Sequence, residues 1–359
     1  MSFMRCFGNL LSKRVVSRYC NVQQTLSTLA HAKYSNIAEN KQSENLLLMD
    51  VDCGIDDANA IILALSAFRT SKLLGITCVN GNIRVDQVVK NVAYVLEICE
   101  RDDIPVFAGA DHPLVTQHVH APPFHGTDGL GDIKKRNDNP EWKDKVLRED
   151  HAVHAMINLI NQNRNKVSLI MIGPLTNLAL ACRLDPTFPS KVKDLTIMGG
   201  NYQGKGNITT AAEFNFYADP EAANVVLETF PDVCTTRIVP WESALASYLP
   251  WDWVTKKWFC QGTKKSQFTR NILANVLDNW RNESPKGYTS SDAVAVATVL
   301  DPTIVKDYVE VAASVETDGR LTKGQVVIDW DNRSNRSLIQ VITQINLKKF
   351  KEMMWNSTL

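Results

Sequence analysis

Four aspartates lie within eight consecutive positions of this chain, at Asp50, Asp52, Asp56 and Asp57. Carboxylates this close repel one another unless a positive charge lies between them, and a hard divalent cation with oxygen ligands is the usual solution. One of these acids alone would more often cap or charge the first turn of a helix. The crowding of all four instead favours a metal site.

The flanking residues predict the elements that would position these acids. Residues 46–52 are typical of a buried parallel strand, on which Asp50 and Asp52 would point to the same face. Gly54 permits a tight turn, and apolar residues at helical spacing follow in 60–65. In open α/β sheets, ligands bind at the carboxyl end of such a strand. We therefore expect the acids to meet at that edge of a sheet.

Strand-like and helix-like segments continue to alternate along the chain, which indicates a βαβ series and a mostly parallel central sheet flanked by helices. Further strands are expected at 73–79, 104–108, 167–172, 195–198 and 235–239. After Pro240 the chain becomes helical and rich in tryptophan, and we expect most of these tryptophans to pack helices onto the core. Strand-like runs at 309–315 and 325–330 and a closing helix complete one large α/β domain, residues 44–359.

Composition points to a soluble globular protein with a small partner. The 359 residues are 44% hydrophobic and 22% charged, and 39 basic residues balance 39 acidic ones. No global field recruits nucleic acid or an anionic membrane, and no apolar stretch is long enough to span a bilayer. The eight cysteines occur singly, without zinc spacing, which fits a reducing compartment.

The first 43 residues differ from the rest. They are basic and contain several serines, and no acidic residue precedes Glu39. This is the composition of a mitochondrial transit peptide, although it also fits a flexible cytoplasmic extension. We expect a cytoplasmic protein, with mitochondrial import as the alternative.

Beyond these patterns, residues 50–60 resemble the DxDxGxDDAxA signature of the inosine-uridine preferring nucleoside hydrolases. Further segments resemble later motifs of that family in the same order: Asn80–Asn82, Phe124–Gly131, Gly173–Ala179, Met198–Gly200, Ala212–Ala222 and Ser291–Ala295. The resemblance implies the α/β fold of that family, with a Rossmann-like core. It also implies hydrolysis of the N-glycosidic bond of a ribonucleoside to ribose and free base, by a homodimer or homotetramer.

The resemblance further assigns roles to individual residues. It implies a calcium ion held by Asp52, Asp57, Asp292 and the backbone carbonyl of Ile172, with Asp52 as the base that takes a proton from a calcium-bound water. The positions that grip ribose hydroxyls in the family correspond here to Asp56, Asn82, Asn207, Glu213 and Asn215. Met198 corresponds to a wall against the base, although a methionine is more often part of the core.

The chain departs from the family pattern at the residue before the last metal-binding aspartate. The best-known members have a histidine there that protonates the departing base, whereas this chain has Ser291. A serine hydroxyl is a poor general acid. His125 or Tyr288 could supply the missing function, or stacking on an aromatic ring could raise the proton affinity of the base. Candidates for the base pocket are Phe124, Trp241 and Tyr288. Cys53 replaces the usual signature proline, a change we expect to be tolerated.

Two other functions compete with this interpretation. A catalytically impaired nucleoside- or ribose-binding protein would keep the sugar-binding residues after losing its acid. A magnesium phosphatase of the haloacid dehalogenase type also begins with Asp-x-Asp after a strand. That second alternative leaves Asp56, Asp57, Glu213 and Asp292 without a role.

Overall fold

The computed structural model describes residues 44–115, 117, 123–133, 140–275 and 277–359. The predicted N-terminal extension, residues 1–43, lies outside the described residues. From Asn45 to Leu359 the chain forms one compact unit. None of the described helices is both long and apolar enough to cross a membrane.

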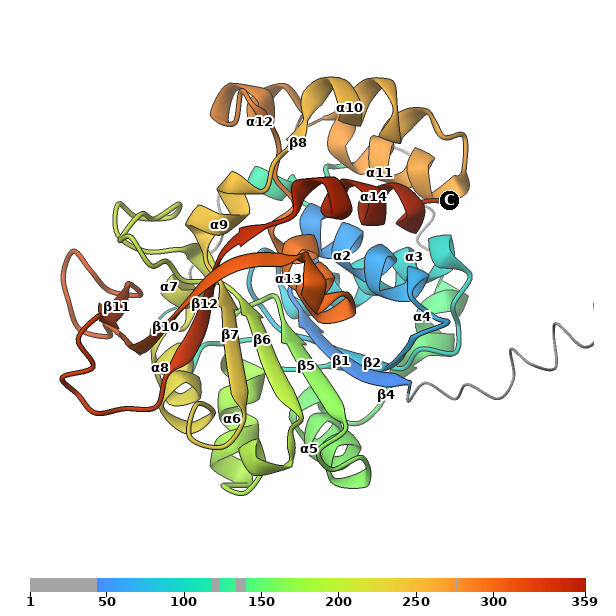
Figure 1. The fold of residues 1–359 in the computed structure, drawn as a ribbon. Coiled ribbons are helices and arrows are strands. Elements are labelled where there is room, and N and C mark those ends of the chain that lie inside the picture. Colours follow the sequence, from blue (N-terminus) through green and yellow to red (C-terminus); the bar gives the residue numbers. More distant parts are fainter. Residues whose placement is uncertain (1–43, 116, 118–122, 134–139, 276) are drawn as a thin grey trace, which may run out of the picture. The chain divides into compact units, whose positions relative to one another are not determined.

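A ten-stranded sheet runs through this unit in the order β11-β10-β12-β7-β6-β5-β1-β2-β3-β4. Strands β1 to β7 pair in parallel with their neighbours, and β12 pairs in parallel with β7 (Figure 1). Strand β10 pairs antiparallel with β12 on one side and with β11 on the other. The prediction of a mostly parallel sheet is therefore confirmed. The strands are β1 (Asn45–Val51), β2 (Ser71–Cys78), β3 (Val106–Ala108), β4 (Leu147–Arg148), β5 (Val167–Met171), β6 (Asp194–Met198), β7 (Thr235–Val239), β10 (Val305–Val315), β11 (Val326–Asp329) and β12 (Ile339–Ile345).

Helices cover both faces of the sheet, as the alternating pattern predicts (Figure 1). One face carries α2 (Ile55–Ser66), α3 (Val85–Cys99), α13 (Ser291–Leu300) and α14 (Leu347–Ser357). The other carries α5 (Ala152–Gln162), α6 (Thr176–Leu184) and α8 (Pro220–Thr229). Short helices lie between these elements, namely η1 (Pro123–His125), α4 (Pro140–Val146), η2 (Pro189–Lys191), α7 (Phe214–Ala218) and η4 (Pro302–Ile304).

The tryptophan-rich region after Pro240 forms a separate helical layer, as expected. It contains α9 (Trp241–Ala246), α10 (Trp251–Lys256), η3 (Trp258–Cys260), α11 (Lys264–Ala274) and α12 (Leu277–Glu283). Two short antiparallel strands, β8 (Leu249–Pro250) and β9 (Gly287–Tyr288), hold its two ends together. Figure 1 places α10, α11 and α12 beyond α2 and α14, on the face of the sheet that carries those two helices.

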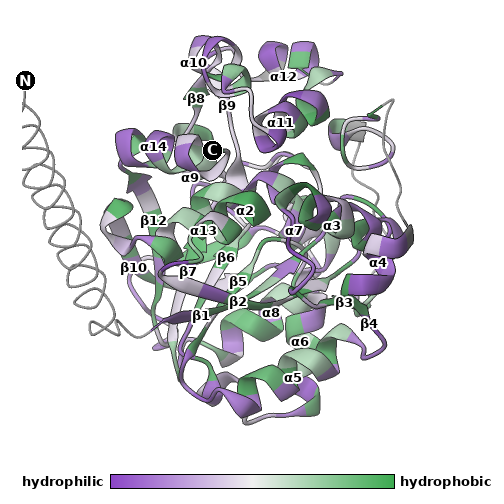
Figure 2. Cartoon of the chain, turned by 90° about the vertical axis from the view of Figure 1, so that its right-hand side faces the viewer, coloured by the Kyte–Doolittle hydropathy of each residue, from purple (hydrophilic) through white to green (hydrophobic). Residues whose placement is uncertain are grey.

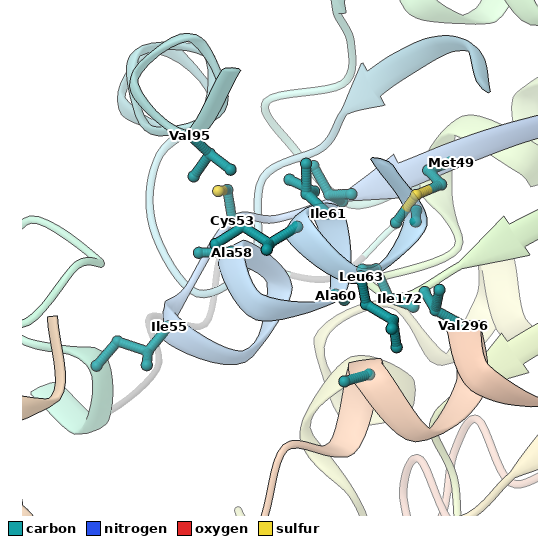
Figure 3. Packing of buried hydrophobic residues seen from close by; sticks show 14 of the residues in the cluster. Met49, Cys53, Ile55, Ala58, Ala60, Ile61, Leu63, Val95, Ile172 and Val296 are labelled. Atoms are coloured by element: carbon teal, nitrogen blue, oxygen red, sulfur yellow. The ribbon is translucent and has the colours of Figure 1, made fainter. Parts of the chain in front are cut away.

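The signature segment is embedded in the core. In α2 every residue except Asp56 and Ser66 is buried, because this helix packs on the sheet and also against α3, α13 and α14. A helix enclosed in this way is apolar around most of its circumference, and the buried polar residues of α2 are Asp57 and Asn59. Figure 3 shows Cys53 facing Val95, with Val296 of α13 on the other side of α2. Figure 2 shows the same distribution at larger scale, with hydrophobic residues in the central strands and α13 and hydrophilic ones along α4 and α11.

This packing matters for the aspartates. Each fully buried Leu or Ile side chain contributes about 1.5–3 kcal/mol of transfer free energy, so the interior turns of α2 fix the position of its first turn. The acids at that turn are consequently held on a rigid element.

Candidate active site

A cavity of about 300 Å³ opens where the predicted carboxyl edge of the sheet meets the helical layer. Its polar floor comes from the loops after β1, β2, β5 and β6 and from the start of α13, and its opposite side is aromatic. The lining residues are Asp56, Asn82, Phe124, His125, Ile172, Met198, Asn207, Ile208, Glu213, Phe214, Asn215, Trp241, Leu245, Trp251, Trp280, Ser284, Gly287, Thr289, Ser291 and Asp292.

Three carboxylates at and just below the floor form a cluster able to hold a metal ion. Asp56, Asp57 and Asp292 each place a carboxylate oxygen within 4.8 Å of the others. Asp56 and Asp57 lie in the first turn of α2, and Asp292 lies in the first turn of α13. Negative charge is favoured at a helix N-terminus, and two such termini meet here because α2 and α13 pack together.

Asp52 lies directly beneath this cluster, fully buried. Its Oδ2 accepts a hydrogen bond from the backbone N–H of Asn82 at 2.7 Å, while its own N–H donates to Asp57 at 3.2 Å. A Cβ on Gly81 would approach Asp52 Oδ2 to 2.1 Å, so only glycine lets the second loop come this close. Asp52 Oδ1 has no hydrogen-bond partner among the described residues, and neither has Asp56 Oδ1.

Crowding and burial raise the pKa of the carboxyl groups at this floor. Burial is the main cause for Asp52, Asp57 and Asp292, and the charges of neighbouring aspartates raise their pKa further. The carboxylates of Asp57 and Asp292 each place an oxygen within 4.8 Å of the other, so their negative charges are not separated by any large distance. A cation would neutralise these charges and satisfy the bare oxygens. An all-oxygen donor set of this kind suits a hard ion such as Ca²⁺.

Backbone and amide groups complete the floor. The carbonyl of Ile172, which follows β5, accepts a hydrogen bond from Asn215 Nδ2 at 3.0 Å. The same amide donates to the carbonyl of Met198 at 3.2 Å, at the end of β6. Asn215 therefore ties together the ends of two neighbouring strands, and Ile172 keeps a second lone pair free for another partner.

Glu213 is the N-cap of α7. Its carboxylate accepts hydrogen bonds from the backbone N–H groups of Gly200, Asn215 and Phe216 at 2.8, 3.0 and 3.2 Å. Burial nevertheless raises the pKa of Glu213 to about 7, against which these three bonds act. Asn207 lines the cavity from an exposed loop whose backbone is bonded to Ala212.

The structure thus gathers the predicted site residues at one place. Nine of them line the cavity: Asp56, Asn82, His125, Ile172, Met198, Asn207, Glu213, Asn215 and Asp292. Asp52 and Asp57 lie one layer below and are hydrogen-bonded to Asn82, whose Nδ2 is 3.4 Å from Asp57. Asp56, expected as a sugar ligand, also belongs to the carboxylate cluster with Asp57 and Asp292.

His125 presents a defined tautomer to the cavity. Its Nδ1 accepts a hydrogen bond from the backbone N–H of Ile55 at 3.2 Å, so the neutral ring carries its proton on Nε2. Burial lowers the pKa of His125, although the charge of Asp56, 3.8 Å from Nδ1, acts in the opposite direction. The group is therefore available as a neutral N–H donor.

The aromatic side of the cavity is a stack of rings. Phe124 stacks on Trp280 with centroids 4.5 Å apart, and Trp280 stacks on Tyr288 at 5.2 Å. The indole N–H of Trp280 donates to the carbonyl of Phe124 at 3.1 Å, which fixes the outer pair. Trp241 and Phe124 line the cavity as predicted. Tyr288 does not, because it is fully buried behind Trp280, with its hydroxyl accepting from Asn59 at 2.9 Å.

Two tryptophans of the lining, Trp251 and Trp280, were not singled out by the motif comparison. Both belong to the tryptophan-rich helical layer, and that enrichment was the only available signal. Ser291 lines the cavity beside Asp292, where its hydroxyl cannot act as an acid at neutral pH. Thr289 also lines the cavity, and its Oγ1 has no partner among the described residues.

Comparison with known proteins agrees with this geometry. The family model described as inosine-uridine preferring nucleoside hydrolase matches residues 47–352. The inosine-uridine preferring nucleoside hydrolase of Leishmania major is 35% identical over 306 residues, which cover 85% of this chain and 94% of that protein. The pyrimidine-specific ribonucleoside hydrolase of Shigella boydii is 31% identical over 82% of this chain and 92% of its own length.

Solved structures give the same result. An inosine-guanosine nucleoside hydrolase superposes with a TM-score of 0.80 at 31% identity, covering 87% of this chain and 98% of that one. A plant nucleoside hydrolase superposes with a TM-score of 0.79 at 25% identity, covering 88% and 99%. The chain therefore belongs to the inosine-uridine preferring nucleoside hydrolase family.

Proposed function

We propose that this protein hydrolyses the N-glycosidic bond of ribonucleosides, releasing ribose and a free nucleobase. The single observation that carries the proposal is the carboxylate cluster at the floor of a cavity whose opposite side is a stack of aromatic rings. A nucleoside has the matching polarity, with a hydroxylated sugar at one end and a flat base at the other. The family of the chain supports the same reaction.

The resident metal is proposed to be Ca²⁺, held by Asp52, Asp57, Asp292 and the carbonyl of Ile172. Support comes from the unpartnered buried oxygens of Asp52 and Asp56 and from the close approach of the Asp56, Asp57 and Asp292 carboxylates. Among the described residues, these carboxylates accept hydrogen bonds from backbone and amide groups, not from Lys or Arg. When bound, the ion would neutralise the acids, orient sugar hydroxyls and make a nearby water more acidic.

Ribose is proposed to lie on the polar floor. Carboxylate oxygens accept from hydroxyl groups, and amides both accept and donate, so this set can bind vicinal hydroxyls in one orientation. The residues assigned to this role are Asp56, Asn82, Asn207, Glu213 and Asn215. Their rigid attachment to strand ends and to the first turn of α2 would hold the anomeric carbon above Asp52.

Asp52 is proposed as the general base. It takes one proton from the attacking water, whose oxygen bonds to the anomeric carbon as the bond from that carbon to the base nitrogen breaks. The other proton of the water stays on the new sugar hydroxyl. Positive charge develops on the ribosyl ring in such reactions, and the surrounding carboxylates stabilise it. His125 donates a hydrogen bond from its neutral Nε2–H to the leaving nitrogen, in place of the histidine that Ser291 replaces, and the departing base takes its proton from solvent.

The base is proposed to lie against the aromatic side, between the Phe124–Trp280 pair and Trp241, with Met198 at the sugar end. Named relatives differ in preference, since one is called inosine-uridine preferring and another pyrimidine-specific. The aromatic side accepts any flat base. We propose a ribonucleoside substrate and leave the choice between purine and pyrimidine to direct assay.

The test is release of reducing sugar from inosine, guanosine, adenosine, uridine and cytidine, with calcium and with chelator. At saturating calcium, Asp52→Asn should abolish release, although the loss of one charged ligand also weakens calcium binding. Asp194→Asn, a carboxylate at the opposite end of β6, is the matched control and should leave the rate unchanged. Saturable nucleoside binding without any product would replace the proposal by the binding-protein alternative.

A further inference from the structure

Two loops that are distant in sequence must be held in register for the proposed chemistry. The signature loop, residues 52–57, carries Asp52, Asp56 and Asp57. The His125 loop, residues 124–131, carries Phe124 and His125. Because the attacking water and the leaving base lie on opposite sides of the anomeric carbon, the distance between these loops sets how well proton removal by Asp52 coincides with the hydrogen bond from His125 to the leaving nitrogen.

Asn91 of α3 joins the two loops directly. This side chain is fully buried, and its Nδ2 donates to the carbonyl of Cys53 at 2.9 Å and to the carbonyl of Asp128 at 2.9 Å. Its Oδ1 accepts from Gln87 Nε2 at 2.9 Å, one helical turn earlier. Both donor hydrogens and the acceptor are therefore in use, and the amide cannot rotate without losing a bond.

The backbone on each side is shaped to this amide. Cys53 has φ +24°, a conformation that is strained for a residue with a side chain and persists only when its surroundings enforce it. On the other side, Gly129 has φ +79°, and a Cβ there would lie 2.8 Å from Asn91 Nδ2. The His125 loop thus approaches the amide as closely as a glycine allows.

A further hydrogen bond joins the two loops directly. It is the bond from the Ile55 N–H to His125 Nδ1, which is longer, at 3.2 Å. Within the His125 loop, the N–H of Gly131 donates to the carbonyl of His125 at 2.8 Å. Asp128 lies between these two residues in the closed turn, so a shift of its backbone also moves the histidine. Asn91 therefore acts together with the Ile55 bond and with the edge-to-face contact between His125 and Trp280 in fixing the orientation of the histidine.

We propose that Asn91 is a positioning residue that sets His125 against the acidic cluster by tying the signature loop to the His125 loop. The inference rests on the proposed role of His125 as hydrogen-bond donor to the leaving nitrogen. Asn91 touches neither substrate nor metal in this account and acts through the carbonyls of Cys53 and Asp128.

The decisive experiment is a double-mutant cycle of Asn91→Leu and His125→Ala, measured as kcat and KM for sugar release. Asn91→Leu keeps the side-chain size and removes all three hydrogen bonds. We expect kcat to fall about 10-fold to 100-fold, as displacement of a catalytic group by about 1 Å does, with little change in KM. In the His125→Ala background the same substitution should cost no more than about 3-fold.

A second readout does not depend on turnover. In ¹⁵N NMR spectra of the histidine side chains, His125 of the wild-type protein should show the pattern of an imidazole protonated on Nε2. In Asn91→Leu this pattern should shift towards an average of both tautomers. A wild-type protein that hydrolyses no nucleoside would refute the proposed function, whereas an unchanged His125 spectrum in Asn91→Leu would refute the role of Asn91.

Controls separate positioning from general stability. Thr358→Val removes a buried hydroxyl that bridges Trp258, Gln261 and Met354, none of which lines the cavity, and should lower the melting temperature without lowering kcat. If Asn91→Leu does not fold, Gln87→Leu, which removes one bond to the amide, should give a smaller loss with the same non-additivity. The proposal would be overturned if the loss of kcat in the double variant equalled the product of the losses in the two single variants. It would also be overturned if the calcium affinity of Asn91→Leu fell in parallel with its kcat.

Discussion

Replacing Asp292 by asparagine tests the acidic cluster with two readouts of opposite sign. The substitution keeps the size and one carbonyl oxygen of the side chain but removes its charge. In the metal-free protein it relieves repulsion, so stability should stay the same or rise. In the presence of calcium it removes a ligand, so the stabilisation by the ion should shrink.

The magnitudes follow from the geometry. Two unit charges 4.8 Å apart repel by about 3.5 kcal/mol at an effective dielectric constant of about 20, and Asp292 lies within that distance of both Asp56 and Asp57. Burial and the neighbouring charges raise the pKa of Asp292, and protonation of this carboxyl already removes part of the repulsion, so we expect a gain of about 1–2 kcal/mol per relieved neighbour at most. At a calcium concentration 1,000 times the wild-type Kd, the ion stabilises by about 4 kcal/mol, and a 100-fold weaker site would retain about 1.4 kcal/mol.

The assay is urea denaturation of wild type and Asp292→Asn, each with chelator and with calcium, followed by calorimetric titration of calcium. The expected result is an equal or more stable metal-free variant that gains about 2–3 kcal/mol less from calcium than wild type. Destabilisation of the metal-free variant together with unchanged calcium affinity would refute the reasoning, because the cluster would then be a structural network rather than a cation site.

Three further predictions concern the acid, the base pocket and pH. Ser291→His should raise kcat when His125 is replaced by alanine, measured by sugar release, and no rescue would place the leaving-group acid elsewhere. Trp280→Leu should raise KM about 5-fold to 150-fold, the equivalent of about 1–3 kcal/mol of base stacking, with a smaller change in kcat. Because the folded-state pKa of Glu213 is raised to about 7, its contribution to stability is complete below about pH 4.5 and is lost as pH rises through 7. Metal-free Glu213→Gln should therefore lose less stability than wild type between pH 5 and pH 8 in urea titrations, and equal slopes would contradict the assigned pKa.

Local patterns were sufficient to predict the elements that carry the acids. The apolar run before Asp52, the turn at Gly54 and the spacing in α2 identify a strand, a turn and a helix, because each depends on residues close in sequence. The placement of Asp292 against them followed only from the family resemblance. Physically, it depends on α13 packing against α2, a contact between segments far apart in the chain.

Other features could not be predicted for the same reason. Trp280 and Tyr288 are both aromatic and both near the site in sequence, yet only Trp280 lines the cavity. Their order in the stack depends on how α12 and β9 fold over the sheet, and no periodicity encodes that arrangement. Asn91 appears in sequence as an ordinary polar residue in a helix, and its role becomes visible only once two loops are seen to meet at its amide.

The most direct test of the account is the rate of sugar release from its best nucleoside as a function of free calcium, using full-length protein first stripped with chelator. We predict no release without metal, saturable recovery as calcium is added, and a midpoint equal to the Kd measured by calorimetry for one ion per chain. Full activity in the stripped protein, or calcium binding that leaves the rate unchanged, would contradict a cation-centred carboxylate site as the origin of the reaction.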